Sequence, residues 1–473
     1  MSLLLELPKI IEDAKTEYER LLSDQSVWDS FAMSEEYGSD GNILGQGDNG
    51  KFMVDLMKAK DLLGKLQMVY IDPPFFSRSN YHSVLKIQGE EGPSADADSS
   101  KEKPEKVSLK LKQHAYKDTW ENGMGEYLRM LCIRLFLIKD LLREDGTVWL
   151  HLDWHSVYYV KIFMDEIFGE KNFINEIVWT YKSGGTSKKH FARKHDTIIV
   201  YGKSPKYYLD LPFEKSYNRG LKPYRFKGVK EYEDDHGWYT MVRMKDVWSI
   251  DMVGRTSSER TGYATQKPEA LLERIIAAST RKGDVCGDFF CGSGTMAAVA
   301  TGMERKWVCC DNSQPAAMIT LKRVLGKGGN CCFEIEKETL KNFPDALRRA
   351  DKESEFAAVN GAITCENRIT LSYEKMLHGN ILLSIEDFKP SLGEEYEKNV
   401  ADQNPLALVG YWAVDLDYKG GIFKPDVWEC REGSTLNTSM DLDTCEHSIG
   451  QRTLVKVVDI LGNVYFEEIH IAL

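Results

Sequence analysis

The sequence lacks an apolar stretch long enough to cross a membrane. Its longest uncharged apolar run, Leu406 to Val414, has nine residues, whereas a membrane-spanning helix needs about 20. The first residues meet an acid at Glu6 and have no basic start, which is not typical of a secretory signal. These absences predict a soluble, cytoplasmic protein without a membrane partner.

Cysteine and histidine patterns of zinc sites are also missing. The ten cysteines form no CxxC pair and no Cys/His cluster with metal spacing, so we expect free, buried thiols in a reducing compartment and no metal. His151, His155, His190 and His195 are expected to be solvated or core histidines. Apolar residues at 42% and charged residues at 28% exclude a wholly disordered, collagen-like or coiled-coil chain.

Positive charge is scarce overall but concentrated in one segment. The formal net charge is −12, yet Lys182–Lys230 holds 13 Lys/Arg against 3 Asp/Glu, a net of +10. From residue 331 onward, 14 Lys/Arg stand against 26 Asp/Glu, a net of −12. A solvated surface is the ordinary explanation of a charge run. Contact with phosphates better explains why the positive charge of this chain gathers in one segment while the rest is neutral or acidic. The residues predicted to contact the phosphates of a nucleic acid are Lys182, Lys188, Lys189, Arg193 and Lys194.

Short apolar strands alternate with amphipathic helices, which predicts an α/β fold with a doubly wound, mostly parallel sheet. The expected strands are 42–45, 66–71, 146–152, 175–180, 196–201, 284–287 and 306–310. The expected helices are 50–63, 125–143, 156–168, 268–280, 295–302 and one near the N-terminus that is followed by a loop.

Changes in this rhythm suggest the domain organisation. A mobile loop, 77–119, is expected because its centre is rich in Ser, Glu and Lys and cannot bury a core. The expected units are an N-terminal helical extension (1–40), a first core part (41–202), a target-recognition region (203–262), a second core part with the cofactor loop (263–330) and an acidic, β-rich C-terminal domain (331–473).

A glycine loop, Asp288-Phe-Phe-Cys-Gly-Ser-Gly-Thr295, joins a predicted strand to a predicted helix. Glycines let the backbone approach a ligand closely, and the start of a helix favours an anionic group. Asp311 ends the next strand, where an acid can accept hydrogen bonds from ribose hydroxyls. The loop therefore indicates a nucleotide-type cofactor site, although an ordinary tight turn is the alternative.

Asp72-Pro73-Pro74-Phe75 follows the strand at 66–71. Ligands of open α/β sheets bind at the carboxyl ends of strands. The two prolines fix the backbone and remove two N–H donors, which leaves the Asp72 carboxylate and the Pro73 carbonyl as acceptors. Such a set suits an exocyclic amine, and the ring of Phe75 can stack on a base lifted out of a duplex. The alternative is a structural Pro-Pro turn.

Together the two motifs resemble the amino-group DNA methyltransferases that use S-adenosylmethionine. The target-amine motif precedes the cofactor loop by more than 200 residues, an order similar to the beta class and its permuted Rossmann-like fold. Thr265-Gln266-Lys267-Pro268 also looks like that family's TQKP element. Tyr116–Trp120, Asp165–Gly169 and Asn172–Trp179 resemble stretches of type III modification (Mod) subunits. Phe75 stands where the family usually has Tyr. A Phe ring keeps the face on which a base can stack.

The resemblance implies methyl transfer to the N6 amine of an adenine in double-stranded DNA, with the target base flipped out. It also implies a homodimer and a partner nuclease-helicase. The implied catalytic residues are Asp72, Pro73, Pro74 and Phe75. The implied cofactor-binding residues are Asp48 near the adenine ring, Lys267 facing the methionine carboxylate, Asp311 on the ribose, and Asp288, Phe290, Gly292, Gly294 and Thr295 around the pocket.

Three other interpretations compete. A cytosine N4 methyltransferase would use the same acceptors, although Ser more often begins its motif. A non-catalytic subunit could bind DNA and cofactor within a defence complex. A nicotinamide dehydrogenase fits the glycine pattern at 292–297 alone and leaves Asp72-Pro73-Pro74-Phe75 unexplained.

Overall fold

A computed structural model describes most of the 473 residues. The residues outside the description are 1–2, 29, 39–40, 89–107, 186–187, 255, 328–332, 339–367, 377–379, 391–404, 432–435, 444–448, 451, 461 and 472–473. Much of the low-complexity centre of the expected 77–119 loop therefore lies outside it, as do Cys331, Cys332, Cys365 and Cys445. None of the described helices is long and apolar enough to cross a membrane.

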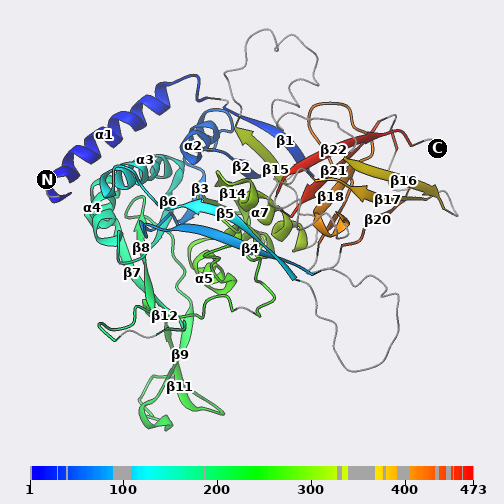
Figure 1. Ribbon diagram of the computed structural model, residues 1–473. Helices are drawn as coiled ribbons and strands as arrows, with labels where there is room; N and C mark the ends of the chain where they lie inside the picture. Colours follow the sequence, from blue (N-terminus) through cyan, green and yellow to red (C-terminus); the bar gives the residue numbers. More distant parts are fainter. Residues whose placement is uncertain are drawn as a thin grey trace.

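A ten-stranded sheet forms the centre of the molecule, in the order β1-β15-β2-β14-β13-β3-β6-β8-β7-β12 (Figure 1). The six strands from β15 to β6 run parallel to one another, whereas β1 and β8 run antiparallel to the strands beside them. The bounds are β1 Phe31–Tyr37, β15 Phe333–Glu338, β2 Asn42–Gln46, β14 Lys306–Asp311, β13 Val285–Asp288, β3 Leu66–Ile71, β6 Leu142–Leu152, β8 His195–Gly202, β7 Phe173–Thr180 and β12 Val247–Ser249.

Helices cover both faces of this sheet because successive residues of a buried strand point to opposite sides. In β3, Val69 and Ile71 pack with helices α2, α3 and α4, whereas Met68 and Tyr70 pack with α5, α6 and α7. Helix α1 lies on the outside of α3 (Figure 1). The bounds are α1 Leu3–Ser23, α2 Asn49–Lys58, α3 Met124–Leu141, α4 Val157–Phe168, α5 Glu269–Ser279, α6 Thr295–Gly302 and α7 Gln314–Gly326. The predicted α/β class and mostly parallel sheet are confirmed.

Two expectations at the first edge of the sheet were incomplete. A loop was expected after the first helix, but residues 31–37 form β1, which pairs antiparallel with β15. Strand β15 also pairs with β2, so the central sheet continues past residue 330. Neither pairing has a local signal, because the paired segments lie far apart in the sequence. The expected helix at 50–63 ends earlier, at Lys58.

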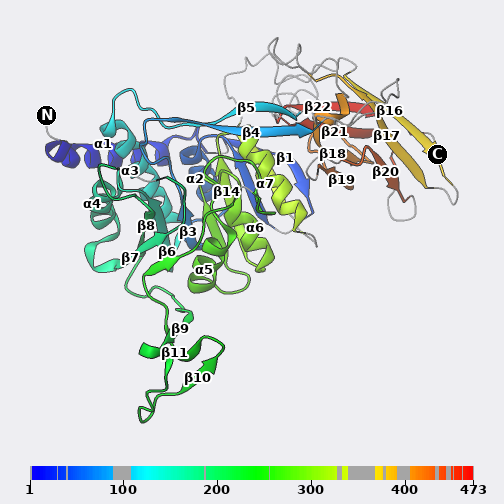
Figure 2. The ribbon, with the colours of Figure 1, turned by 60° about the horizontal axis from the view of Figure 1, so that its bottom comes forward.

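The expected mobile loop at 77–119 contains a hairpin instead. Strands β4, Asn80–Gln88, and β5, Ser108–Lys117, pair antiparallel from Asn80↔Lys117 to Gln88↔Ser108. Figure 2 shows the hairpin running along the core toward the C-terminal sheets, where β4 approaches the short 3-10 helix η4 (Pro405–Leu408). The expectation of irregular structure was therefore wrong for the residues of these two strands.

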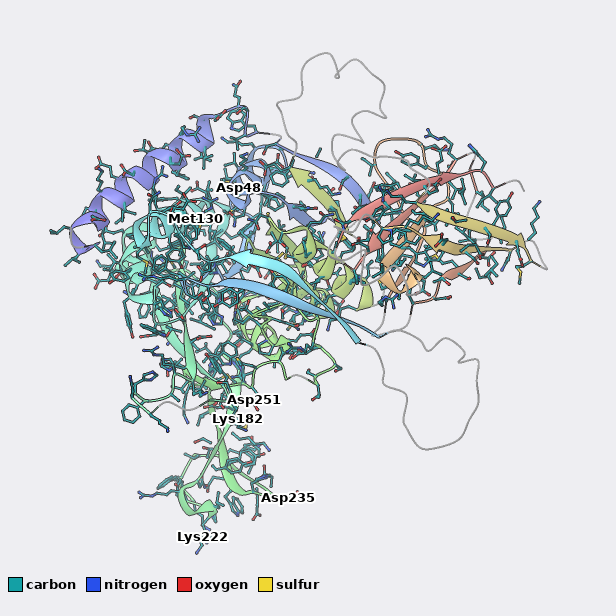
Figure 3. The ribbon with its side chains drawn as sticks, viewed as in Figure 1. Asp48, Met130, Lys182, Lys222, Asp235 and Asp251 are labelled. Atoms are coloured by element: carbon teal, nitrogen blue, oxygen red, sulfur yellow. The ribbon has the colours of Figure 1, made fainter. Side chains whose placement is uncertain are left out.

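Residues 203–262 contain a projecting finger (Figures 1 and 2). A three-stranded antiparallel sheet builds it, in the order β10-β11-β9. The bounds are β9 Phe213–Tyr217, β10 Glu231–Asp234 and β11 Gly237–Arg243. Figure 3 shows Lys222 and Asp235 far out on the finger and Lys182 and Asp251 near its root.

The C-terminal region forms two smaller sheets around a separate core, with the orders β16-β17-β20 and β19-β18-β21-β22. The β-rich prediction for this region agrees with them; the division into domains stays a prediction. The bounds are β16 Ile369–Lys375, β17 Ile381–Phe388, β18 Val409–Asp415, β19 Val427–Cys430, β20 Ser439–Leu442, β21 Thr453–Asp459 and β22 Val464–Ile469. A fully buried ion pair, Lys456 Nζ to Glu35 Oε2 at 2.5 Å, ties β21 to β1 of the central sheet.

Candidate active site

The carboxyl ends of four neighbouring parallel strands meet at one edge of the sheet. Asp72 follows β3, Asp288 ends β13, Asp311 ends β14 and Asp48 follows β2. They surround a cavity of about 520 Å³, a volume within the usual range of small-molecule sites. Of the predicted catalytic and cofactor residues, those that line it are Asp48, Asp72, Pro73, Pro74, Phe75, Lys267, Asp288, Phe290, Gly292, Thr295 and Asp311. Gly294 lies behind the cavity wall.

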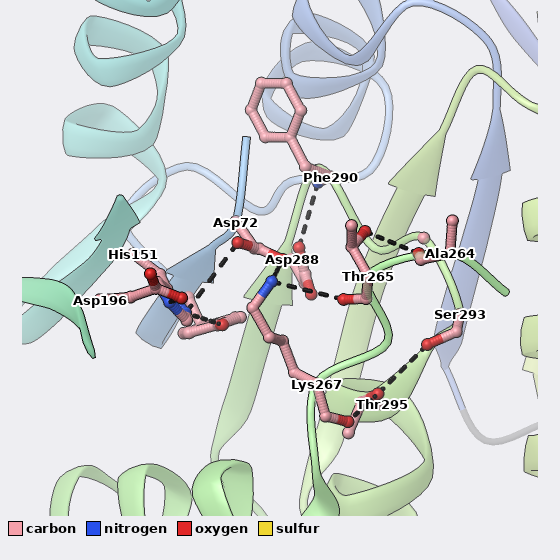
Figure 4. Close-up of polar contacts among 12 residues, drawn as sticks. Asp72, His151, Asp196, Ala264, Thr265, Lys267, Asp288, Phe290, Ser293 and Thr295 are labelled. Carbon is pink, nitrogen blue, oxygen red and sulfur yellow. Dashed lines mark hydrogen bonds and ion pairs between the residues drawn. The ribbon is translucent and has the colours of Figure 1, made fainter. Parts of the chain in front are cut away.

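Asp72 is held at one carboxylate oxygen and open at the other. The Lys267 ammonium contacts Oδ2 and also donates to the Thr265 carbonyl at 3.4 Å (Figure 4). Oδ1 is buried, and no described group hydrogen-bonds to it; His151 Nδ1 lies 3.9 Å away. A buried oxygen without a donor costs free energy unless a ligand supplies one. Oδ1 is therefore the clearest sign of a missing hydrogen-bond donor in the cavity.

The position of Lys267 differs from the expectation. We expected it to face a methionine carboxylate, but its ammonium contacts Asp72 and lies 5.2 Å from the centre of the Phe75 ring. An anionic cofactor group would have to compete with Asp72 for this cation. The cofactor role of Lys267 stays a prediction, whereas its contact with Asp72 was not foreseen.

Asp118 fixes the chain that follows Phe75. It is fully buried and accepts hydrogen bonds from the backbone N–H of Phe76 (3.1 Å) and Ser77 (2.6 Å), the Ser77 hydroxyl (2.7 Å) and the Trp120 indole N–H (3.2 Å). Phe76 has φ +65°, an uncommon conformation for a bulky side chain. Three of these donors belong to the turn itself, so Asp118 positions Asp72-Pro73-Pro74-Phe75 from a distant part of the sequence.

A buried polar chain lies behind the Asp72 carboxylate. The Tyr70 hydroxyl lies 2.8 Å from His151 Nδ1, and His151 Nε2 lies 3.4 Å from Asp196 Oδ2 (Figure 4). Tyr181 donates to Asp196 Oδ1 at 3.1 Å. Because β8 is antiparallel to β6, Asp196 near its start reaches the same edge as His151 near the end of β6. His151 is fully buried, which agrees with a core histidine, but it also borders the site.

The glycine loop packs closely enough to require its glycines. Gly294 has φ +68°, and a Cβ there would lie 2.5 Å from the Thr320 hydroxyl oxygen on α7. Gly292 has φ +49°, and its N–H donates to Asp311 Oδ2 at 2.9 Å. The Thr295 hydroxyl, at the start of α6, donates to the Lys267 carbonyl at 3.1 Å. The loop and the Thr265–Pro268 segment thus form one wall of the cavity.

Burial alters the two acids on this wall. Desolvation holds the pKa of Asp288 well above its usual range, and the nearby Asp72 and Asp311 carboxylates raise it further, against a hydrogen bond from the Phe290 N–H at 3.1 Å. Burial also raises the pKa of Asp311, although the N–H groups of Ser313 and Gly292 oppose the shift. A protonated Asp288 can donate a hydrogen bond into the cavity as well as accept one.

Asp48 begins helix α2 and is held by Arg134. Its Oδ1 accepts the Lys51 N–H at 2.9 Å as an N-cap, and its Oδ2 pairs with Arg134 at 2.8 Å. Arg134 Nε also donates to the Asn49 side chain at 3.0 Å, and Asn49 donates to the Phe289 carbonyl at 2.6 Å. Asn49, Arg134, Trp120 and Tyr263 line the cavity too. No sequence motif marks them, since they come from four separate parts of the chain.

The five predicted DNA-binding residues lie in the β7–β8 connection, away from the cavity wall. Lys182, Lys188, Lys189 and Arg193 are exposed. Lys194 is half-buried, and its ammonium donates to the carbonyls of Ser183 (2.8 Å) and Gly184 (2.7 Å). Lys194 therefore stabilises the loop, whereas the other four side chains are accessible to solvent.

The cavity fits the cofactor expected from the sequence. Asp311 has spare acceptor capacity for hydroxyl groups, the glycines allow close backbone approach, and Phe290 and Met130 add apolar surface. Among the residues that the structure describes, no group of three His, Cys, Asp or Glu is placed to hold a metal ion.

Comparison with known proteins agrees with this geometry. A family model described as DNA methylase matches residues 66–322. Type II methyltransferase M.EcaI of Enterobacter cloacae is 25% identical over 374 residues, which cover 66% of this chain and 74% of that protein. Type II methyltransferase M2.DpnII of Streptococcus pneumoniae is 28% identical over 290 residues, covering 61% and 91%.

Solved structures that match this chain include M1.HpyAVI in complex with SAM, at 15% identity and a TM-score of 0.35, covering 59% of this chain and 98% of that chain. The cytosine-N4-specific PvuII DNA methyltransferase has 13% identity and a TM-score of 0.38, covering 61% and 89%. The family model spans more than half of the sequence and contains both motifs. The chain therefore belongs to the DNA methylase family, whose methyl donor is S-adenosylmethionine.

Proposed function

We propose that the chain methylates the N6 amine of an adenine in double-stranded DNA, as the modification enzyme of a restriction-modification system. The observation that carries the proposal is Asp72, which lines the cavity and whose buried Oδ1 has no donor among the described residues. An exocyclic amine offers the N–H that this oxygen lacks. The Type II names of the similar proteins support the restriction-modification setting.

Asp72 acts on the amine by accepting its hydrogen. The lone pair of an aromatic amine is delocalised into the ring, so the nitrogen is a poor nucleophile. A hydrogen bond from N–H to Oδ1 shifts electron density back to the nitrogen, and the same oxygen can take the proton that the nitrogen loses. The contact of Lys267 with Oδ2 fixes the orientation of the carboxylate, so Oδ1 keeps its position while the amine reacts. Fixed acceptors of this kind lower a barrier because they need no reorganisation.

Phe75 and the walls of the cavity position the reactants. The half-buried ring of Phe75 offers a face on which a flipped base can stack. Asp48, Asp311 and the glycine loop would hold S-adenosylmethionine, and bound there it would supply an already activated methyl group. Proximity of the two reactants in the cavity then provides much of the rate.

Adenine is preferred over cytosine because Asp, rather than Ser, begins the motif. The acceptor set itself suits either amine, so the distinction rests on the resemblance. A homodimer and a partner nuclease-helicase remain predictions from the same resemblance.

Modification-sensitive long-read sequencing tests the proposal. DNA is taken from a methylation-free host that expresses this chain, with the Asp72→Ala variant as control. We expect one sequence motif to carry N6-methyladenine with the wild type and none with the variant. N4-methylcytosine would replace the adenine assignment, and wild-type marks in the variant would contradict the role of Asp72.

A further inference from the structure

The β7–β8 connection, residues 181–194, is a loop with a firmly closed base. Thr180 pairs with His195 across the two strands, and the Tyr181 N–H donates to the Lys194 carbonyl at 3.2 Å. The Lys194 ammonium then crosses to the carbonyls of Ser183 and Gly184. The part of the loop nearest the core is therefore fixed in place.

This closed base adjoins the active site. Tyr181 donates to Asp196, Asp196 contacts His151, and His151 Nδ1 lies 3.9 Å from Asp72 Oδ1. The base of the loop is therefore linked to the catalytic carboxylate through Asp196 and His151, and the loop extends outward from the same edge of the sheet. A duplex whose target base entered the cavity would pass over this edge.

Phe191 stands in the outer part of the loop and is 98% exposed, the highest value among the large apolar side chains described as exposed. A ring in this position adds nothing to the buried core, because the hydrophobic effect rewards only the area removed from water. Lys188, Lys189 and Arg193 are exposed on either side of it. Cations on both sides of the ring suit the phosphates of DNA, and the apolar ring between them suits the faces of its stacked bases.

Trp154 braces the loop from the neighbouring β6–α4 connection. The Arg193 guanidinium lies 3.9 Å from the centre of the Trp154 ring, and the His155 ring lies 3.8 Å from it on centroids. These interactions fix Arg193, two residues after Phe191. The exposed ring is thus carried close to a supported point of the loop, with the cations at 188–189 on its other side.

We propose that Phe191 inserts into the DNA base stack at the position that the target base leaves, and so holds that base in the cavity. This inference rests on the proposed function, since it requires a flipped base. Flipping leaves a gap one base deep, and an aromatic ring can fill such a gap by stacking on the neighbouring bases. Phe191 is a positioning residue in this mechanism: it touches the duplex, not the reacting atoms.

The test compares two duplexes that carry the methylated motif identified by sequencing. In one, the target base is paired; in the other, an abasic site faces it, so the base leaves the stack at little cost. Phe191→Ala is expected to lower kcat/KM about 30-fold on the paired duplex, the scale of one base–aromatic stack, and less than about threefold on the abasic one. Phe191→Trp should stay near wild type on both.

Tyr158→Ala is the matched control, because Tyr158 is also a highly exposed aromatic side chain (71%) but lies on α4. It should leave both duplexes unaffected. An equal loss on both duplexes with Phe191→Ala would identify a backbone contact instead and overturn the insertion, as would no loss on either. If the wild type methylates neither duplex, the proposed function itself fails, and this inference fails with it.

Discussion

The cavity at the carboxyl edge of the sheet and the loop 181–194 beside it hold their side chains in opposite ways. In the cavity, Asp72 is fixed by Lys267, the turn after it by three hydrogen bonds to Asp118, and Asp311 by two N–H groups. In the loop, Lys188 and Phe191 extend into solvent. Chemistry on one atom needs fixed geometry, whereas phosphate contacts add up from separate exposed charges. Substitutions in the cavity should therefore have large effects on kcat, whereas substitutions of the loop cations should have smaller effects, on KM for DNA.

The largest effect is expected at Asp72. Replacing it with Ala removes the acceptor for the amine and should lower kcat by about 10³-fold or more. Cofactor affinity should change little, since the glycine loop and Asp311 remain. Methyl transfer from labelled cofactor measures the first quantity and calorimetric titration the second. Turnover at the wild-type rate would remove Asp72 from the mechanism.

Asp118→Ala comes next, and it tests whether rigidity matters as much as the carboxylate itself. The N–H groups of Phe76 and Ser77 would lose their acceptor, so the turn after Phe75 would relax. We expect kcat to fall about 10- to 100-fold, the order of loss that a misplacement of about 1 Å at the reacting groups causes. Asp118→Asn keeps one acceptor oxygen and should lie between. Unchanged kcat in Asp118→Ala, in a protein with native circular dichroism, would show that the turn holds itself.

Substitutions of Asp288 separate two contributions of its side chain to cofactor binding, its shape and its charge. Its pKa is raised by burial, so the neutral carboxyl is the form that the fold favours. Asp288→Asn should therefore bind cofactor within about threefold of wild type, whereas Asp288→Ala should lose about tenfold or more because the Phe290 N–H loses its acceptor. The reverse order in a cofactor titration would mean that the ionised carboxylate is the binding form.

The same substitution has a consequence for pH. Because the pKa of Asp288 is raised in the folded state, the stabilisation from this group is complete below the ordinary pKa of a carboxyl and is lost as the pH rises through the raised value. Wild-type unfolding free energy should thus fall with rising pH in that window, and Asp288→Asn should flatten the fall. Denaturant unfolding at several pH values measures both.

The smallest effect on turnover is expected from the loop. Changing Lys182, Lys188 and Lys189, which are all exposed, together to Gln should leave kcat unchanged and raise KM for DNA about tenfold at low salt. The salt slope of binding should become smaller by about 0.9 for each phosphate that is no longer neutralised. Lys194 is kept because it closes the loop. The matched control changes three exposed cations of α1, Lys9, Lys15 and Arg20, to Gln. An unchanged salt slope in the loop variant would place DNA binding elsewhere.

The contrast also explains what could be predicted from the sequence. Asp72-Pro73-Pro74-Phe75 and the glycine loop are local motifs at strand ends, so both their positions and their meeting at one edge followed from the parallel sheet. Asp118 and the pair of His151 and Asp196 carry no local signature. They reach the site through the register of β6 with β8 and through the hairpin, and long-range pairing of this kind is not written in any short segment.

The outer strands of the central sheet, at the β1 side, also show that long-range pairing is not readable from a short segment. Strands β1 and β15 were missed because each is recognisable only beside its partner, and the segment 80–88 paired with 108–117 across a stretch whose composition predicts no core. Exposed positions in the basic loop were easier to anticipate, since charge clustering is a property of the sequence itself. Lys194 is the exception, because its ammonium binds the loop backbone.

The central claim is that the buried Asp72 carboxylate promotes methyl transfer to adenine N6. Mass spectrometry of nucleosides from DNA of a methylation-free host tests it directly, with the wild-type chain and Asp72→Ala expressed at equal levels. We predict N6-methyl-2′-deoxyadenosine from the wild type and none above background from the variant. Equal amounts of the methylated nucleoside from both, or N4-methylcytosine in its place, would contradict the claim.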